Sequence, residues 1–352
     1  MTHRAFLFLL IVSSAAPSAD AATGIMQPDA QQALSFGQGL HVVITGSGSA
    51  LPDPERGGAS AAVIVDGAVL QFDFGRRVMD NLMLAGINPV DIDYVFFTHH
   101  HFDHIATYDY YMIANWIAGR QERVLVLGPE GTEQMTRDAL EMHDSDRAFV
   151  EFIVDNWPES VATRPSRQPP YEARDVDPGI VLQTEIFKVT AASTPHYPAN
   201  MRRSLAYRVD TPYGTVVVTG DTGYSDAVIE LSRDADLLIH EAQKPDPGMV
   251  SGGKMSGPEF QEPDSDPHRP QTHHTSPTEL GIIAEKAKVK KVIAYHLPPF
   301  TSVAKAVEMT SLYTGAAPGF QIWGEYINAI KKNYSGPVIL AEDAMIITVG
   351  EK

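Results

Sequence analysis

Eight residues in the first third of the chain, THHHFDHI (Thr98–Ile105), constrain this protein more than any other stretch of its sequence. The segment holds four histidines and one aspartate, more polar side chains than a hydrophobic core readily satisfies with hydrogen bonds. They follow the pattern His-x-His-x-Asp-His at His99, His101, Asp103 and His104. Without a metal, titratable groups this close would repel one another or need costly partners. Because imidazole and carboxylate suit zinc or another divalent transition metal, the segment predicts a metal site.

The local backbone predicts how these side chains are presented. The segment follows a predicted strand, Tyr94–His99, and therefore lies at the strand's carboxyl end. His99 and His101 alternate along extended backbone and should point the same way, whereas His100 between them should point away. Asp103 and His104 can then turn back toward the same point as the next helix begins.

Three further candidate ligands lie at other predicted strand ends. They are His196 in TPHYP, Asp221 in VVVTGDTG and His296 in VIAYHLPP. Taken alone, such a histidine is more often a satisfied core or surface residue than a ligand, and Asp221 could be a simple turn residue. Seven ligands exceed what one tetrahedral zinc uses, but they suit two metals that share a bridging carboxylate.

Composition removes several classes of chemistry and of partner. The chain has no cysteine, which excludes cysteine nucleophiles and thiolate ligands. Its formal net charge of −17 argues against a nucleic-acid backbone as a main partner. With 43% hydrophobic and 20% charged residues, the chain has the composition of a globular protein that buries a sizeable core.

The N-terminal residues are typical of a secretory signal. Arg4 precedes an apolar stretch, Ala5–Val12, and the small residues at Ala19–Ala21 suit a cleavage site. This stretch is too short for a permanent membrane anchor, because a spanning helix needs about 20 apolar residues. We therefore expect a signal peptide over 1–21, a lead segment over 22–39, one domain over 40–352, and a periplasmic or secreted protein.

Strands and helices alternate through the rest of the chain. Strands are predicted at Leu40–Gly46, Ala61–Asp66, Val69–Gly75, Arg123–Gly128, Leu205–Val209, Thr215–Gly220, Asp236–His240 and Lys291–His296. Helices are predicted over Arg76–Gly86 and Ser276–Val289. This mixture indicates an α/β layered domain. Two proline-rich segments, Asn156–Gly179 and Lys244–Pro277, are predicted as irregular loops that either form part of a site or are surface insertions.

The order of these motifs resembles the metallo-β-lactamase superfamily, and within it the ribonuclease Z and arylsulfatase branch. Besides the metal motifs, the likeness rests on TGSGSALPDPERGGAS (Thr45–Ser60), FDFG (Phe72–Gly75), LGPEGTEQM, LLIHEA (Leu237–Ala242) and HHTSPTELGIIAEKAKVKKVIAYHLPP. It covers the chain from about Leu40 onward. The resemblance implies an α/β fold of one domain, an αββα sandwich, with a di-metal site at one edge of the two sheets.

The resemblance also implies a role for each candidate residue. The first zinc would be held by His99, His101 and His196, the second by Asp103, His104 and His296, and Asp221 would bridge the two. Asp73 would orient a ligand histidine, as such carboxylates often do. We expect two zinc ions per chain, although the sequence does not distinguish zinc from manganese or iron.

A second pair of residues is implied to act on protons. The resemblance places His274 beside the metals with Glu241 behind it, and a carboxylate there raises the basicity of an imidazole and suits it to general-acid work. Asp103 would act in catalysis as well as in metal binding. His240 is expected to be a structural companion and His273 a surface residue, while Glu241 could instead be a helix-start carboxylate.

These residues predict an exported di-zinc hydrolase of small anionic esters, either phosphodiesters or aryl sulfates. A hydroxide held between two metals is available near neutral pH, and a net positive pocket would favour an anionic substrate. The alternatives are a lactonase or β-lactamase, a ribonuclease Z-type endonuclease, and a non-catalytic binding protein of the same fold. Met142–Pro178, which replaces the basic arm of ribonuclease Z, is acidic and has no lysine. Gly57 stands where that family usually has asparagine. For both reasons we expect no nucleic-acid partner.

The sequence does not show the oligomeric state, and a homodimer is a reasonable expectation on general grounds.

Overall fold

Most strands of this protein are buried on both faces, so each sheet must be covered on both sides. The computed structural model describes residues 36–158, 164–197, 203–244, 246, 273–298 and 322–350, which belong to one compact unit, Leu34–Lys352. The predicted signal peptide, most of the lead segment and most of Lys244–Pro277 lie outside these residues. Among the described helices, none is both long and apolar enough to cross a membrane.

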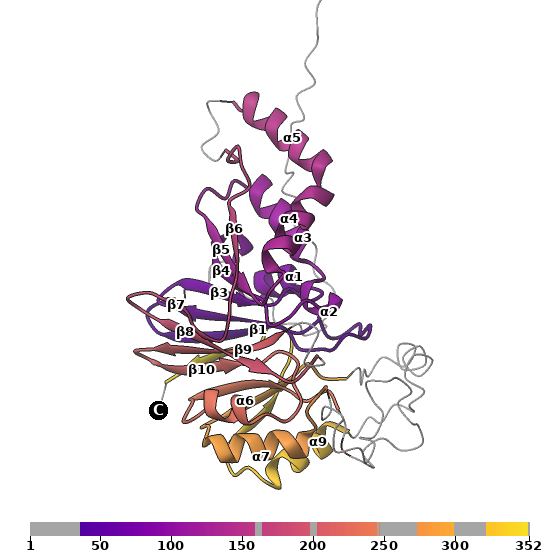
Figure 1. The fold of residues 1–352 in the computed structure, drawn as a ribbon, viewed down its shortest axis with the longest axis vertical. Helices are drawn as coiled ribbons and strands as arrows, with labels where there is room; N and C mark the ends of the chain where they lie inside the picture. The colour runs from indigo at the N-terminus through magenta and orange to yellow at the C-terminus, as the bar shows by residue number, and fades with distance from the viewer. Residues whose placement is uncertain are drawn as a thin grey trace, which may run out of the picture. The chain divides into compact units, whose positions relative to one another are not determined.

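Two seven-stranded sheets form the centre of the molecule (Figure 1). The first has the order β14-β1-β2-β3-β4-β5-β6, with bounds Ile346–Val349, Leu40–Gly46, Ser60–Val65, Ala68–Phe72, Ile92–Phe96, Val124–Gly128 and Tyr171–Asp175. The second has the order β13-β12-β11-β10-β9-β8-β7, with bounds Val338–Leu340, Val292–Tyr295, Leu237–Glu241, Gly214–Val218, Ser204–Thr211, Lys188–Thr194 and Gly179–Gln183.

Helices cover the outer face of each sheet (Figure 1). Beside the first sheet lie α1 (Val78–Leu84), α2 (Phe102–Ile105), α3 (Tyr108–Ile117), α4 (Thr132–Met142) and the short η1 (Pro89–Asp91), whereas α5 (Asp144–Asp155) packs against α3 and α4. Beside the second lie α6 (Asp226–Leu231), α7 (Pro277–Ala287) and α9 (Ile322–Lys331). The described chain is therefore the αββα sandwich that the sequence predicts.

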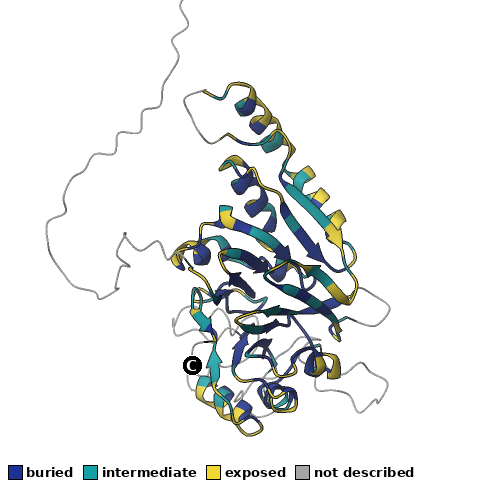
Figure 2. Cartoon of the chain, turned by 90° about the vertical axis from the view of Figure 1, so that its left-hand side faces the viewer, coloured by how far each residue is buried: buried dark blue, intermediate teal, exposed yellow. Residues whose placement is uncertain are grey.

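Alternation along the strands assigns each side chain to a layer. In β1, Leu40, Val42 and Ile44 enter the core between the sheets, whereas Val43 packs against the helices of the first sheet. In β10, Val216 and Val218 enter the same central core, and Val217 packs against α6 and α7. Figure 2 shows the result, with buried strands inside and exposed residues on the outer helices.

One of the two predicted irregular segments contains regular structure. Within Asn156–Gly179, the residues Tyr171–Asp175 form β6, which pairs in parallel with β5 at the edge of the first sheet. Its sequence, YEARD, is half-buried or exposed along its length, so it lacks the apolar run by which the buried strands are recognised. The prediction of an irregular loop is wrong at these five residues.

Strand direction gathers several chain segments at one edge of the sandwich. β10, β11 and β12 are mutually parallel, and β8 runs the same way because β9 is antiparallel to both β8 and β10. Their carboxyl ends therefore meet at one edge. Two hydrogen bonds join this edge to the end of β4 in the other sheet: the amide of Leu205 donates to the Thr98 carbonyl at 2.9 Å, and the Tyr207 hydroxyl donates to the Phe97 carbonyl at 2.7 Å.

Helix α7 begins with a reciprocal cap that is two residues beyond His274. The Ser276 hydroxyl accepts from the amide of Glu279, and the Glu279 carboxylate accepts from the amide of Ser276 at 2.8 Å. Ser276→Ala should lower the free energy of unfolding by about 1 kcal/mol, measured by chemical denaturation. Glu279→Gln is the control, because glutamine also closes this type of cap; equal loss in both variants would contradict the assignment.

Candidate metal centre

All seven predicted metal ligands lie together at the sheet edge, and they form two sets that share Asp221. The first set is His99, His101, His196 and Asp221, and the second is Asp103, His104, His296 and Asp221. Each comes from a loop that follows a strand or, for Asp103 and His104, from the start of α2. This brings together segments nearly 200 residues apart in the chain. Asp103 Oδ2, for example, lies 3.2 Å from His296 Nε2.

The first set gathers three imidazoles around one point. His101 Nδ1 lies 3.0 Å from His99 Nε2 and 3.0 Å from His196 Nε2. The expectation that His99 and His101 point the same way is confirmed. His100 points elsewhere, as predicted, and its Nε2 lies 2.8 Å from the Thr132 hydroxyl on α4.

The second set lies against the other side of Asp221. His104 Nε2 is 3.5 Å from Asp103 Oδ2, and His296 Nε2 is 3.2 Å from the same oxygen. His296 has a positive φ of 52°, an uncommon conformation for a residue with a side chain and one that clusters at functional sites.

The two carboxylate oxygens of Asp221 are divided between the sets. Oδ2 lies 3.7 Å from His99 Nε2 and 3.6 Å from His196 Nε2. Oδ1 lies 3.1 Å from His104 Nε2 and 3.2 Å from His296 Nε2. One carboxylate thus presents a separate oxygen to each set, which is the arrangement that a bridging ligand requires.

These spacings fit metal ions. Ligands about 2.1 Å from a tetrahedral zinc lie about 3.4 Å from one another, and the neighbouring donor atoms quoted above span 3.0 to 3.7 Å. His104 Nε2 and Asp221 Oδ1 are buried and form no hydrogen bond with other described groups. Buried polar atoms without a partner are rare and need an explanation, and a cation between them supplies one.

Asp73 orients a histidine of each set. Its Oδ2 accepts from His104 Nδ1 at 2.8 Å and from the Thr98 hydroxyl at 2.7 Å. Since that hydroxyl donates to Asp73, it accepts from His99 Nδ1, 3.1 Å away. Both imidazoles therefore carry their proton on Nδ1 and leave Nε2 to bind metal. The hydrogen bond from a candidate ligand histidine to Asp73 is present as predicted, whereas the part played by Thr98 was not predicted.

The third imidazole of the first set is fixed by a backbone carbonyl. His196 Nδ1 donates to the carbonyl of His273 at 2.9 Å, and the His273 ring in turn contacts the carbonyl of His196. His273 is half-buried, so the expectation of a surface residue is wrong. No motif signals this contact, because the carbonyl that accepts is present in every residue.

Glu241 and His274 form the predicted pair beside the metal ligands. Glu241 ends β11 and is fully buried, and its Oε1 lies 2.9 Å from His274 Nδ1. The same carboxylate accepts from the amides of Thr222 and Gln243, at 2.8 and 3.1 Å, which hold it in place. Glu241 therefore belongs to a strand, and the alternative that it is a helix-start carboxylate is wrong. His240 is buried on the other face of β11, as a structural residue would be.

The electrostatics of the centre call for added positive charge. Burial lowers the pKa of His99 well below its ordinary value and that of His196 to about 4, which keeps both imidazoles neutral and able to bind a cation. Burial also opposes the charged form of His104, but neighbouring carboxylates, led by Asp221, outweigh it and hold its pKa well above the ordinary value. For His274, likewise, Glu241 outweighs burial and raises the pKa to about 9.

Glycine is required where Asp221 meets the metal-binding loop. Gly220 has a φ of +62°, and a Cβ atom there would lie 2.4 Å from the Cβ of Thr98. A side chain at this position would separate Asp221 from Thr98, the residue that joins Asp73 to His99.

Comparison with known proteins agrees with this geometry. The sequence matches the family described as the β-lactamase superfamily domain over residues 69–297. Two proteins named ribonuclease Z are each 27% identical to this chain. The match to the protein of Mycobacterium bovis BCG spans 211 residues and covers 59% of this chain and 71% of the relative. The match to the protein of Mycobacterium sp. strain KMS spans 263 residues and covers 74% of this chain and 85% of the relative.

Solved structures share the fold at lower identity. The metallo-β-lactamase fold protein YhfI of Bacillus subtilis is 18% identical with a TM-score of 0.60, covering 88% of this chain and 98% of its own. The short form of human tRNase Z is 18% identical with a TM-score of 0.58, covering 88% and 99%.

Replacement of Asp73 should weaken metal binding in a specific way. Asp73→Asn replaces one of the two acceptor oxygens by an NH2 group, so the side chain can no longer accept from the Thr98 amide and from His104 and the Thr98 hydroxyl at once. Zinc affinity should therefore fall about 10- to 100-fold, measured by competition with a chromophoric chelator. Thr98→Ser, which keeps the hydroxyl, is the control and should retain most of the affinity. Unchanged affinity in Asp73→Asn would show that these hydrogen bonds do not orient the ligands.

Proposed function

Because the chain belongs to the metallo-β-lactamase superfamily, which its match over well more than half of its length establishes, we propose that it is a metal-dependent phosphodiesterase. The observation that carries the proposal is the division of the Asp221 oxygens between two ligand sets. Two divalent cations, which we propose to be zinc, would lower the pKa of a shared water and neutralise charge on the ester.

The charges of the ligands favour an anionic substrate. Asp103 and Asp221 contribute two negative charges to the two sets, against the four positive charges of two divalent cations. The remaining ligands are imidazoles, which are neutral when they bind a metal. The excess positive charge would attract the single negative charge of a phosphodiester more strongly than a neutral lactone.

His274 is positioned to handle the proton of the leaving group. With Nδ1 bonded to Glu241, its Nε2 is the nitrogen left to face a substrate. Its ring lies 5.1 Å from that of His196 and 5.8 Å from that of His296, so it borders both ligand sets. Glu241 acts as a positioning residue that holds the ring and stabilises its protonated form.

Two kinds of phosphodiester, small phosphodiesters and RNA, fit this chemistry, and they draw support from different observations. Small phosphodiesters are supported by the charge of Met142–Pro178, which contains eight acidic residues and four arginines. Two of those arginines are paired, Arg167 with Asp155 and Arg174 with Glu172. RNA, the second candidate, is supported by the relatives named ribonuclease Z, which weigh against the expectation that nucleic acid is not a partner.

We also propose that the protein is exported to the periplasm or the medium. The apolar N-terminal segment, Ala5–Val12, supports export, which cell fractionation would test. We also propose aryl sulfates as substrates, because the excess positive charge of the metal centre would attract their single negative charge.

Elemental analysis combined with a substrate panel tests the proposed function. The purified protein should contain about two zinc ions per chain and hydrolyse bis-p-nitrophenyl phosphate faster than a lactone or a β-lactam. A transfer-RNA precursor with a trailing sequence and p-nitrophenyl sulfate complete the panel. Preferential cleavage of the RNA would establish the second candidate, and turnover of the lactone alone would contradict both.

The leaving group should reveal the part played by His274. His274→Ala should slow phosphodiesters with alkoxide leaving groups by about 10²- to 10⁴-fold and those with p-nitrophenolate much less, because p-nitrophenolate leaves without a proton. His143→Ala is the control, since His143 is bonded to Asp109 and Asp146 on other elements. Equal losses for both kinds of ester would remove the general-acid assignment.

A further inference from the structure

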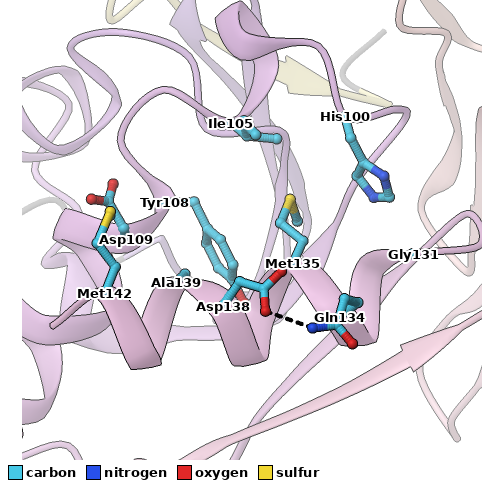
Figure 3. A pocket seen from close by; sticks show the side chains of 10 residues that line it. All are labelled: His100, Ile105, Tyr108, Asp109, Gly131, Gln134, Met135, Asp138, Ala139 and Met142. Atoms are coloured by element: carbon cyan, nitrogen blue, oxygen red, sulfur yellow. Dashed lines mark hydrogen bonds between the residues drawn. The ribbon is translucent and has the colours of Figure 1, made fainter. Parts of the chain in front are cut away.

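A pocket of about 500 Å³ lies on the other side of the metal-binding segment, among α2, α3 and α4 (Figure 3). Its volume is within the range of sites that hold small molecules. Figure 3 shows His100 and Met142 at opposite ends of it, with one face of α4 between them. None of the seven candidate metal ligands lines it.

The pocket and the metal centre share a stretch of backbone. His100 stands between the ligands His99 and His101, and Ile105 follows the ligand His104, yet the side chains of His100 and Ile105 line the pocket. The bond from His100 to Thr132 holds that imidazole on the α4 side. A molecule in the pocket would therefore touch the segment that carries four ligands without touching the ligands themselves.

The body of the pocket is apolar and adaptable. Tyr108, Met135, Ala139 and Met142 contribute apolar surface, and methionine side chains adjust to ligands of different shape. Met142 is 68% exposed, so its side chain is accessible to a ligand. This lining suits the hydrocarbon or aromatic part of a ligand.

The charges that line the pocket are negative. Asp109 and Asp138 are lining residues, and no lysine or arginine is. Asp109 is bonded to His143 at 3.2 Å, so its charge is partly compensated. Asp138 accepts from the amide of Gln134 at 2.5 Å (Figure 3), and no ion pair with a cation is seen for it among the described residues.

We propose that this pocket is a second small-molecule site, and that its ligand is an organic amine with an apolar body. The ammonium group would bind the Asp138 carboxylate, and the apolar body would lie against Tyr108, Ala139 and the two methionines. The same charges disfavour a phosphate-bearing ligand, so the pocket and the metal centre select molecules of opposite charge. The inference does not depend on the reaction proposed for the metal centre.

Binding of matched probes to the full-length, metal-loaded protein tests this assignment. Phenylbutylamine, phenylbutanol and phenylbutyrate share one apolar body and differ in charge, and their affinities are measured by isothermal titration calorimetry. The amine should bind most tightly and the carboxylate least. Asp138→Asn should weaken the amine by about fivefold, as expected for an accessible ion pair, and leave the alcohol unchanged.

A second variant locates the binding site. Ala139→Phe places a ring inside the pocket and should abolish amine binding while the metal content, measured by elemental analysis, stays the same. Asp138→Asn, at an exposed position on α4, keeps the test valid if the larger substitution impairs folding. Equal affinities for the three probes, no saturable binding of any of them, or amine binding that neither variant changes would each overturn the proposal.

Discussion

Three carboxylates, those of Asp73, Asp103 and Asp221, are buried around the ring of His104 where the two sheets meet. Burial of a charge costs several kcal/mol unless partners compensate it. Asp73 is compensated by hydrogen bonds from Thr98 and His104. Asp103 and Asp221 face imidazole nitrogens whose lone pairs suit cations, and the rest of the centre follows from this demand for positive charge.

The sandwich meets that demand through strand direction. Parallel β10, β11 and β12 end at the same edge, and each carries one candidate site residue at or just after its end: Asp221 after β10, Glu241 as the last residue of β11 and His296 after β12. The other sheet contributes β4 and the loop that carries four ligands. Since both faces of each sheet are packed with apolar side chains, the candidate ligands are held on a scaffold whose core does not include the metal.

The two faces of the metal-binding segment have different chemistry. One face gathers the candidate ligand imidazoles and the carboxylates of Asp103 and Asp221, where bound cations would concentrate positive charge. The other face, with His100 and Ile105, borders an apolar pocket with a negative rim. Alternation along extended backbone turns the side chain of His100 away from those of His99 and His101. Ile105, the last residue of α2, faces the pocket from the helix.

The candidate ligand set and the layered fold could be predicted from the sequence. Clustered histidines and aspartates at strand ends are local patterns, and the alternation of apolar residues in β1 and β10 is read from a few consecutive positions. The tertiary structure settled how these side chains are oriented: Thr98 links Asp73 to His99, and His273 fixes His196 through its carbonyl. It also made the half-buried or exposed residues Tyr171–Asp175 an edge strand and placed α3 and α4 beside a pocket. Most of these features depend on contacts between segments far apart in the chain, and several of those contacts use backbone groups that every residue has, so no local pattern of side chains encodes them.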